Sequence, residues 1–322
     1  MSDKEYIVGV DLGGTKLSTV LINKVGEILV RENVPTEAYK GPDAVIQKIK
    51  DTIHTVMDKA GVSLGELEGI GVGSPGPLDA EKGVIKFTSN LPGWVDVPLK
   101  DRIQEEFPVP IKVDNDANAA AVGEGIFGAG KGIKNFVYIT VSTGIGGGAF
   151  IDGKLFHGEN SNGAELGHTT IDMNGPLCGC GNYGCWEALA SGTAFTRRVV
   201  EGLKSGRRES IILDMVGGDI EKVDAKVVFD AARKGDEYAL EMVNREAELL
   251  GVGISNIINS FNPRRIIIGG GMSNDLDMMY AGIMKEIGKR ALKANAEVVE
   301  IVRAKLGKDA GVLGAAALIL SQ

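Results

Sequence analysis

Near its start the chain reads Tyr6-Ile7-Val8-Gly9-Val10-Asp11-Leu12-Gly13-Gly14-Thr15-Lys16, an apolar run that ends in an acid and a glycine turn. The pattern of residues 17–30 then predicts a strand, a turn and another strand. A similar apolar run, residues 135–141, ends in Ser142-Thr143-Gly144-Ile145-Gly146-Gly147-Gly148. Strand, glycine turn and strand therefore occur twice, which indicates a weak internal duplication of one hairpin.

Both turns have the composition of a phosphate-binding site. Amide N–H groups that are free of side-chain bulk bind phosphate oxygens, and a nearby carboxylate can hold magnesium through water. A third glycine turn, Gly269-Gly270-Gly271, follows the predicted strand 265–268 and would let a purine or ribose approach the backbone. One such turn alone is equally consistent with a simple tight turn, but three at comparable strand ends favour a nucleoside triphosphate. The candidate nucleotide and magnesium residues are Asp11, Gly13, Gly14, Thr15, Lys16, Thr143, Gly144, Gly269 and Gly270.

Paired phosphate hairpins face each other across a cleft in two-lobed ATP-binding folds, so we expect an α/β fold with two lobes. We assign a smaller lobe to residues 1–114 and a larger lobe to residues 115–308, and we expect a C-terminal helix at 309–322 to pack back on the smaller lobe. Hydrophobic periodicity predicts the other elements. These are helices at 45–60, 99–107 and 311–320, strands at 67–72 and 111–113, and mainly helical chain from 190 to 259.

The composition is that of an ordinary soluble globular protein, with 43% hydrophobic and 24% charged residues in 322. The net charge of −8 disfavours nucleic acid as a partner. The N-terminal residues lack the pattern of a signal peptide, and no run of about 18 apolar residues suggests a membrane span. We therefore expect a cytoplasmic protein that binds neither membranes nor nucleic acid.

The three cysteines of the chain all lie in Cys178-Gly179-Cys180-Gly181-Asn182-Tyr183-Gly184-Cys185, ten residues after His168. Three thiolates and one imidazole form a closed structural zinc set, and the glycines let the backbone fold tightly around an ion. A disulfide between Cys178 and Cys180 would be strained and would leave one cysteine over. We predict structural zinc bound by His168, Cys178, Cys180 and Cys185.

Asp116 begins an alanine-rich predicted helix, beside Asn115 and Asn118. Aspartate at this position often caps the helix. It also suits a catalytic base, because phosphoryl transfer needs a carboxylate that takes the proton of the acceptor hydroxyl. A helix N-terminus favours the ionised form. Asp114 is the competing candidate; we expect only one of the two carboxylates to point into the cleft, and the helix start favours Asp116.

Five motifs in this order resemble the ROK family (repressors, open reading frames and sugar kinases), and most closely its ATP-dependent kinases of glucose. They are Asp11 to Lys16, Asn115 to Asn118, Thr143 to Gly148, Glu165-Leu166-Gly167-His168, and the cysteine tract through Glu187. The segment Thr88-Ser89-Asn90-Leu91-Pro92-Gly93-Trp94 is also similar. The resemblance covers about residues 7 to 320 and implies the actin-like, sugar-kinase/Hsp70-type ATPase fold.

The resemblance also implies residue roles. Asp116 would be the base for the 6-hydroxyl of the sugar, with ATP and Mg²⁺ at the hairpins and Asp11 organising the magnesium. His168 would ligate zinc through one ring nitrogen and face the sugar with the other. The phosphate turns would lie outside the metal loop, residues 178–185. The implied sugar-binding residues are Asn90, Asn115, Asp116, Glu165, His168 and Glu187.

Two rival functions remain at this point. Kinases of fructose, mannose, allose and N-acetylmannosamine share the same polar framework, and pocket shape around one or two hydroxyls separates them. Sugar-responsive regulators of the same family carry an additional N-terminal DNA-reading module; here the first glycine motif begins at Asp11, and the acidic charge also argues against DNA. Kinases of this kind are usually homodimers, so we expect a homodimer.

Overall fold

The computed structural model describes residues 4–88, 90–206 and 209–321. They form two compact units. The first comprises the described residues of Met1–Tyr138, Gly148–Ala164 and Ala304–Gln322, and the second comprises those of Ile139–Gly147 and Glu165–Arg303. The division does not follow residues 114 and 115, because 115–138 and 148–164 belong to the first compact unit.

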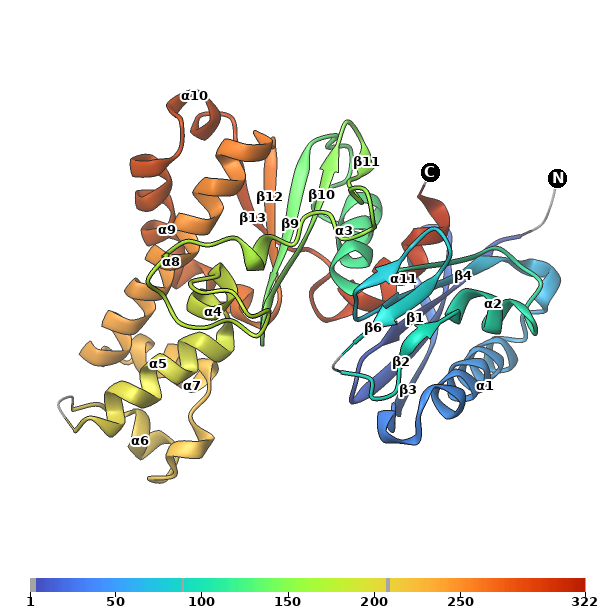
Figure 1. Cartoon of the computed structure of the whole chain (residues 1–322), viewed down its shortest axis with the longest axis horizontal. Helices are drawn as coiled ribbons and strands as arrows, with labels where there is room; N and C mark the ends of the chain where they lie inside the picture. Colours follow the sequence, from blue (N-terminus) through green and yellow to red (C-terminus); the bar gives the residue numbers. More distant parts are fainter. Residues whose placement is uncertain (1–3, 89, 207–208, 322) are drawn as a thin grey trace. The chain divides into compact units, whose positions relative to one another are not determined.

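The first unit is built on a five-stranded sheet (Figure 1). Its strands, in spatial order, are β3 (Ile28–Pro35), β2 (Lys16–Asn23), β1 (Tyr6–Leu12), β4 (Leu67–Ser74) and β8 (Ile111–Asn115). The chain of β1, β2 and β3 forms an antiparallel meander, whereas β4 and β8 run parallel to β1. Since the carboxyl ends of β1, β4 and β8 share one edge of the sheet, the segments after them lie at the same edge.

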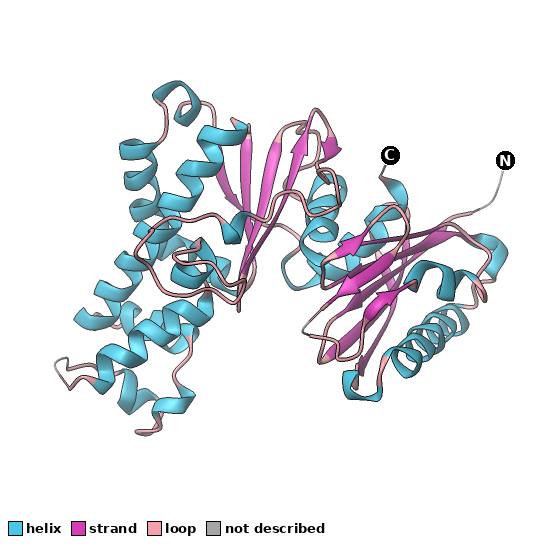
Figure 2. Ribbon diagram, in the orientation of Figure 1, coloured by secondary structure: helices cyan, strands magenta, loops and turns pink. Residues whose placement is uncertain are grey.

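Side-chain alternation assigns the two faces of this sheet to different helices. On one face, Val8 and Val10 of β1 belong to the same core as Ile46 and Ile49 of α1 (Pro42–Ala60). On the other face, Ile7 packs with residues of α11 (Ala310–Leu320), which also lies beside α3 (Asp116–Phe127) (Figures 1 and 2). The C-terminal helix is therefore part of the first unit.

Glycine allows α11 to approach the sheet more closely than a side chain would. A Cβ at Gly9 of β1 or at Gly71 of β4 would overlap carbonyl oxygens of α11, those of Val312 and Ala315. The α3–α11 contact has the same character, because a Cβ at Gly314 would overlap the carbonyl oxygen of Ala119. Backbone therefore packs directly on backbone at Val312, Gly314 and Ala315 of α11.

The second sheet also has five strands. Its strands, in spatial order, are β11 (Lys154–Leu155), β10 (Ile145–Ile151), β9 (Phe136–Val141), β12 (Arg265–Gly269) and β13 (Glu300–Arg303). In the second unit α8 (Glu237–Phe261) packs against its neighbours α4 (Trp186–Ala190), α5 (Gly192–Lys204), α7 (Ala225–Arg233) and α9 (Leu276–Arg290).

The remaining elements are short. They are the strands β5 (Leu78–Asp79), β6 (Val84–Phe87) and β7 (Val95–Val97), the helices α2 (Leu99–Gln104), α6 (Ile212–Met215) and α10 (Lys293–Ala296), and the 3₁₀ turns η1 (Ala38–Lys40), η2 (Leu64–Glu66), η3 (Leu166–His168), η4 (Ile220–Lys222), η5 (Gly271–Asp275) and η6 (Gly307–Asp309).

The α/β class expected from the sequence is confirmed, with differences at element ends. The helix predicted over 99–107 ends at Gln104, because the chain then turns to bury Phe107 in the core ahead of Pro108. The helix predicted from residue 45 begins at Pro42, a residue whose fixed φ suits the first turn. In the part of the chain that the structure describes, no helix has the length and apolar composition needed to cross a bilayer.

We predict that Gly71→Ala destabilises the first unit by about 3 kcal/mol, because the added methyl group meets a carbonyl oxygen that only a shift of α11 can move. Gly65→Ala is the matched control: its Cβ would meet only Ser63 Oγ at 3.9 Å, and we expect a change within about 0.5 kcal/mol. Urea unfolding of both variants measures this. Equal midpoints would show that α11 does not depend on the glycine contact.

Candidate active site

The first glycine turn lies between β1 and β2 at the carboxyl edge of the first sheet. Gly13 N–H donates to the carbonyl of Lys16 at 3.0 Å, and Thr36 Oγ1 donates to the carbonyl of Gly13 at 2.6 Å. A Cβ at Gly14 would run into the backbone carbonyl of Asn90, so this glycine lets the Asn90 segment lie against the turn. The structure thereby brings together two predicted sites, the phosphate turn and Asn90; Ser89 lies outside the described residues.

A cavity of about 370 Å³ opens beside this turn. Asp11 stands at its edge, where burial raises the pKa of the carboxyl and the positive charge of Lys16 opposes that rise. A Cβ at Gly311, in the first turn of α11, would overlap the carboxylate of Asp11. The predicted residues Asp11, Gly13, Gly14, Thr15 and Lys16 all line the cavity.

Two cationic residues of this cavity were not predicted. Arg31 of β3 and Lys308 of η6 line it together with Lys16. Arg31 Nη2 also pairs with Asp309 Oδ1 at 2.7 Å, which joins β3 to the start of α11. No local motif marks either residue, since each reaches the cavity only because β3 and the segment before α11 meet there. Three cations around a glycine turn suit a polyanionic phosphate chain.

The start of α3 carries the candidate base. Asn115 is the N-cap, since its Oδ1 accepts the N–H groups of Ala117 at 2.9 Å and Asn118 at 3.4 Å. Asp116 is therefore the first residue of the helix and not its cap, and it is exposed. Its Oδ1 accepts the Ala117 N–H at 2.7 Å, which holds the carboxylate at the positive end of the helix dipole.

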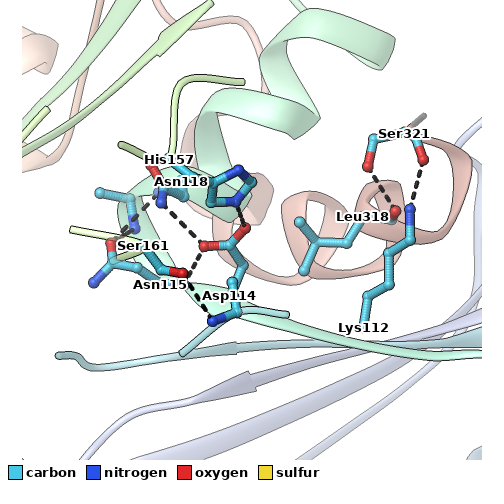
Figure 3. Close-up of polar contacts among 10 residues, drawn as sticks. Lys112, Asp114, Asn115, Asn118, His157, Ser161, Leu318 and Ser321 are labelled. Atoms are coloured by element: carbon cyan, nitrogen blue, oxygen red, sulfur yellow. Dashed lines mark hydrogen bonds and ion pairs between the residues drawn. The ribbon is translucent and has the colours of Figure 1, made fainter. Parts of the chain in front are cut away.

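The competing carboxylate, Asp114, is buried and fully engaged (Figure 3). Its Oδ1 accepts the backbone N–H of Asn115 at 2.7 Å and the amide of Asn118 at 3.0 Å. Its Oδ2 is 2.7 Å from Nε2 of His157. A carboxylate with both oxygens occupied and almost no exposure is poorly placed to receive a proton from a substrate, so the geometry favours Asp116.

In the second unit, the turn at Thr143 and Gly144 contacts Glu187. Glu187 Oε2 accepts the N–H of Ile145 at 2.9 Å, and a Cβ at Gly144 would overlap this carboxylate oxygen. The other oxygen of Glu187 lies 3.9 Å from Cys178 Sγ. The second phosphate turn is thus not part of the metal loop, but one side chain, Glu187, contacts both, which the sequence did not predict.

The four predicted metal ligands converge. The ligand atoms of His168, Cys178, Cys180 and Cys185 all lie within 4.8 Å of one another, and all three cysteines are free thiols. His168 Nδ1 is 3.7 Å from Cys178 Sγ, and Cys180 Sγ is 3.6 Å from Cys185 Sγ. A tetrahedron with Zn–S bonds near 2.3 Å has edges of about 3.8 Å, so these side chains fit a zinc ion.

The metal loop is shaped by its own backbone. Cys178 N–H donates to the carbonyl of Asn182 at 2.7 Å, and Gly181 has the positive φ of 90° that this tight loop requires. Burial raises the pKa of the Cys185 thiol to about 12, so a thiolate at this position needs a bound cation near neutral pH.

Glu165 is the N-cap of the η3 turn that ends at His168. Burial raises the pKa of its carboxyl; the charge of His168 opposes this rise and the charge of Glu187 adds to it. In the second unit, the charges of His168 and Glu187 therefore both act on Glu165, next to the predicted metal ligands.

A larger cavity, about 880 Å³, lies wholly in the second unit. Apolar side chains from three helical segments, Val200, Phe229 and Met272, line it together with Thr143 of the glycine turn. Of the third glycine turn, Gly271 lines this cavity, whereas Gly269 ends β12 and a Cβ at Gly270 would overlap the carbonyl oxygen of Val141. The helical residues carry no recognisable motif, so they could not be predicted.

The sequence and the structure both resemble known proteins. A ROK family model matches residues 7–322. A glucokinase of Thermotoga maritima is 40% identical over 316 residues, 98% of each chain. A ROK family glucokinase from Streptomyces griseus, solved with glucose and AMPPNP, is 32% identical with a TM-score of 0.81, over 97% of this chain and 98% of that one. A xylose repressor of Bacillus spizizenii is 33% identical over 98% of this chain and 77% of the repressor.

These likenesses extend over almost the whole chain, and they include both the mixed sheets and the helices of the two units. The fold is the actin-like, sugar-kinase/Hsp70-type ATPase fold, as expected. The chain belongs to the ROK family.

Proposed function

We propose that this protein is an ATP-dependent glucokinase that phosphorylates glucose at its 6-hydroxyl, with Asp116 as general base. The observation that carries the proposal is the contrast between two neighbouring carboxylates. Asp116 is exposed at the first position of α3, whereas Asp114 is buried with both oxygens hydrogen-bonded. The similarity to glucokinases at 40% and 32% identity supports glucose as the acceptor and ATP as the donor.

In this mechanism, Asp116 accepts the proton of the 6-hydroxyl as the oxygen attacks the γ-phosphorus of ATP. The N-terminus of α3 stabilises the negative charge of the carboxylate before the proton arrives. The bond between the γ-phosphorus and the β–γ bridging oxygen breaks, and ADP leaves with the electron pair. The cations Lys16, Arg31 and Lys308 around the first turn would stabilise the phosphate charge.

Each of the two cavities already described suits one part of a nucleotide. The apolar wall of the larger cavity, with Phe229 and Met272, suits a flat adenine ring, and Thr143 suits the phosphate end. Asp11 would bind Mg²⁺ through water at the smaller cavity, where Gly13 and Gly14 leave backbone N–H groups open to phosphate. Mg²⁺ would supply charge neutralisation at the β- and γ-phosphates when bound.

The sugar would be held by Asn90, Asn115, Glu165, His168 and Glu187 through its hydroxyl groups. His168 Nδ1 faces the cysteine sulfurs, which leaves Nε2 as the nitrogen for a sugar hydroxyl. A zinc ion on Nδ1 would set the tautomer, so that Nε2 carries a hydrogen and donates. We also propose a cytoplasmic location and a homodimer.

The first test is a coupled ADP-release assay on the zinc-loaded protein with Mg-ATP and a panel of hexoses. We expect glucose to give the highest kcat/KM among glucose, fructose, mannose, allose and N-acetylmannosamine. A different preferred hexose would correct the substrate and keep the kinase assignment. No ADP release with any hexose would remove that assignment and favour a sugar-binding regulator.

We predict that Asp116→Asn lowers kcat by about 100-fold or more, because the amide keeps the shape of the side chain and cannot accept a proton. Glucose affinity, measured by calorimetry, should change much less. Asp101→Asn is a suitable control, because Asp101 lies in the first turn of α2 as Asp116 does in that of α3. A nearly unchanged kcat in Asp116→Asn would move the base to another group.

We predict that Cys180→Ala releases one equivalent of zinc per chain and weakens glucose binding strongly, because the loop that positions His168 and Glu187 loses a ligand. AMPPNP binding should weaken less, and only through the contact of Glu187 with the turn at Gly144. Metal analysis and calorimetry measure both effects. Unchanged glucose affinity in the metal-free variant would make the zinc a remote structural ion.

A further inference from the structure

His157 is one of three histidines in the chain and belongs to none of the motifs discussed above. It lies between β11 and η3, on the segment that continues to Glu165. Its Nε2 is 2.7 Å from Oδ2 of Asp114, and this pair crosses 43 residues of sequence (Figure 3). The Asp114 side chain is 6% exposed and that of His157 is 40% exposed, so the pair joins a buried carboxylate to a solvent-accessible ring.

Asp114 also hydrogen-bonds two residues that flank the proposed base, Asp116. Its other oxygen, Oδ1, accepts the backbone N–H of Asn115 and the side-chain amide of Asn118 (Figure 3). These two residues lie directly before and two positions after Asp116. Asp114 therefore contacts the first turn of α3 through one oxygen and His157 through the other.

We infer that His157 is a positioning residue for the phosphoryl-transfer reaction, which acts through Asp114 to hold the first turn of α3 and with it Asp116. This inference rests on the proposed function of Asp116 as base. The imidazolium form of His157 is the form that binds a buried carboxylate most strongly, because it compensates the negative charge as well as donating a hydrogen bond.

The charged groups around His157 agree with this assignment. The cavity beside it, about 670 Å³, is lined by Asp114 and Lys112 of β8, Glu81, Lys154 of β11, and Glu159 of the same segment as His157. Lys112 Nζ donates to the backbone carbonyl of Ser321 at 2.6 Å, so this cation is engaged elsewhere (Figure 3). Of these charged groups, all among the described residues, His157 lies at ion-pair distance from Asp114, with 2.7 Å between Nε2 and Oδ2.

The titration of His157 has a definite direction. The hydrogen bond that His157 Nε2 donates to the Asp114 carboxylate raises the pKa of His157 above its ordinary value of 6.5, while burial opposes the rise. Because the folded-state pKa is the higher one, the stabilisation by this pair is complete below about pH 6.5. It is lost as the pH rises through the raised folded-state value. Positioning of Asp116 should therefore weaken on the alkaline side.

The test compares His157→Ala, His157→Gln and wild type by kcat for glucose from pH 6 to 9. We expect His157→Ala to lower kcat about tenfold near pH 6.5, since small misplacements of a catalytic group cost one to two orders of magnitude. His157→Gln can donate a hydrogen bond and carries no charge, so it should recover part of kcat and lack the alkaline step attributed to His157. The KM for ATP should stay nearly constant in both.

His54→Ala is the matched control. His54 Nε2 lies 2.6 Å from Glu106 Oε1, a pair of similar geometry, but its side chains are 51% and 35% exposed and the pair lies on α1 and the segment after α2. We expect wild-type kcat and pH profile in this variant. Comparison of the histidine ring NMR signals of wild type, His157→Ala and His157→Gln identifies the signal of His157. The pKa measured from that signal should fall in Asp114→Asn.

Two outcomes overturn the inference. One is a His157→Gln enzyme with the kcat and the pH profile of wild type. The other is a His157→Ala enzyme that melts at lower temperature yet keeps wild-type kcat per folded molecule, which would make the pair purely structural. Should His157→Ala fail to fold, the pH profile of His157→Gln decides. A wild-type protein that phosphorylates no hexose would instead contradict the proposed function.

Discussion

The contact between α11 and the glycines of the first sheet is the constraint on which the rest of the first unit depends. Gly9 and Gly71 admit the helix backbone against β1 and β4, and α3 then packs against α11 through Gly314. The same helix begins beside Asp11, where Gly311 leaves room for the carboxylate. One close-packed helix therefore contacts β1, β4, α3 and the Asp11 carboxylate at the phosphate turn.

The acidic residues of the molecule divide into two classes by their surroundings. Glu124 is fully buried and accepts the N–H groups of Ala129, Lys305 and Leu306, so it fastens the segment that carries Lys308. Asp114 is a second carboxylate of this kind, with its oxygens satisfied inside the protein. Such groups are poorly placed to contact a substrate, because their oxygens are buried and already accept hydrogen bonds within the protein. Asp116, by contrast, is exposed at the first position of α3.

The metal loop and the second glycine turn form one structural unit through Glu187. Its carboxylate accepts a hydrogen bond from Ile145 of the turn and approaches Cys178 of the loop. A shift of the loop would therefore move a side chain that contacts the turn. This arrangement links the proposed zinc site to groups proposed for both substrates, so we expect metal loss to affect the binding of the two substrates to different degrees.

Much of this protein was determined by local sequence. The glycine turns, the cysteine tract with His168, and the acid at the start of α3 are contiguous patterns, because phosphate, zinc and helix termini each require specific residue types at short spacing. Strand and helix positions followed from periodicity, with errors at ends such as Gln104, where burial of Phe107 overrides helical pattern.

Tertiary structure alone decided the features that join distant segments. Arg31 and Lys308 line the phosphate cavity because β3 and η6 meet there, and Glu187 reaches the turn at Gly144 from 43 residues away. The choice between Asp114 and Asp116 also depended on folding, since His157 engages Asp114 from another part of the chain. Short-range patterns indicate which chemistry a segment can perform. Burial and long-range hydrogen bonds decide which of two similar groups is accessible to a substrate.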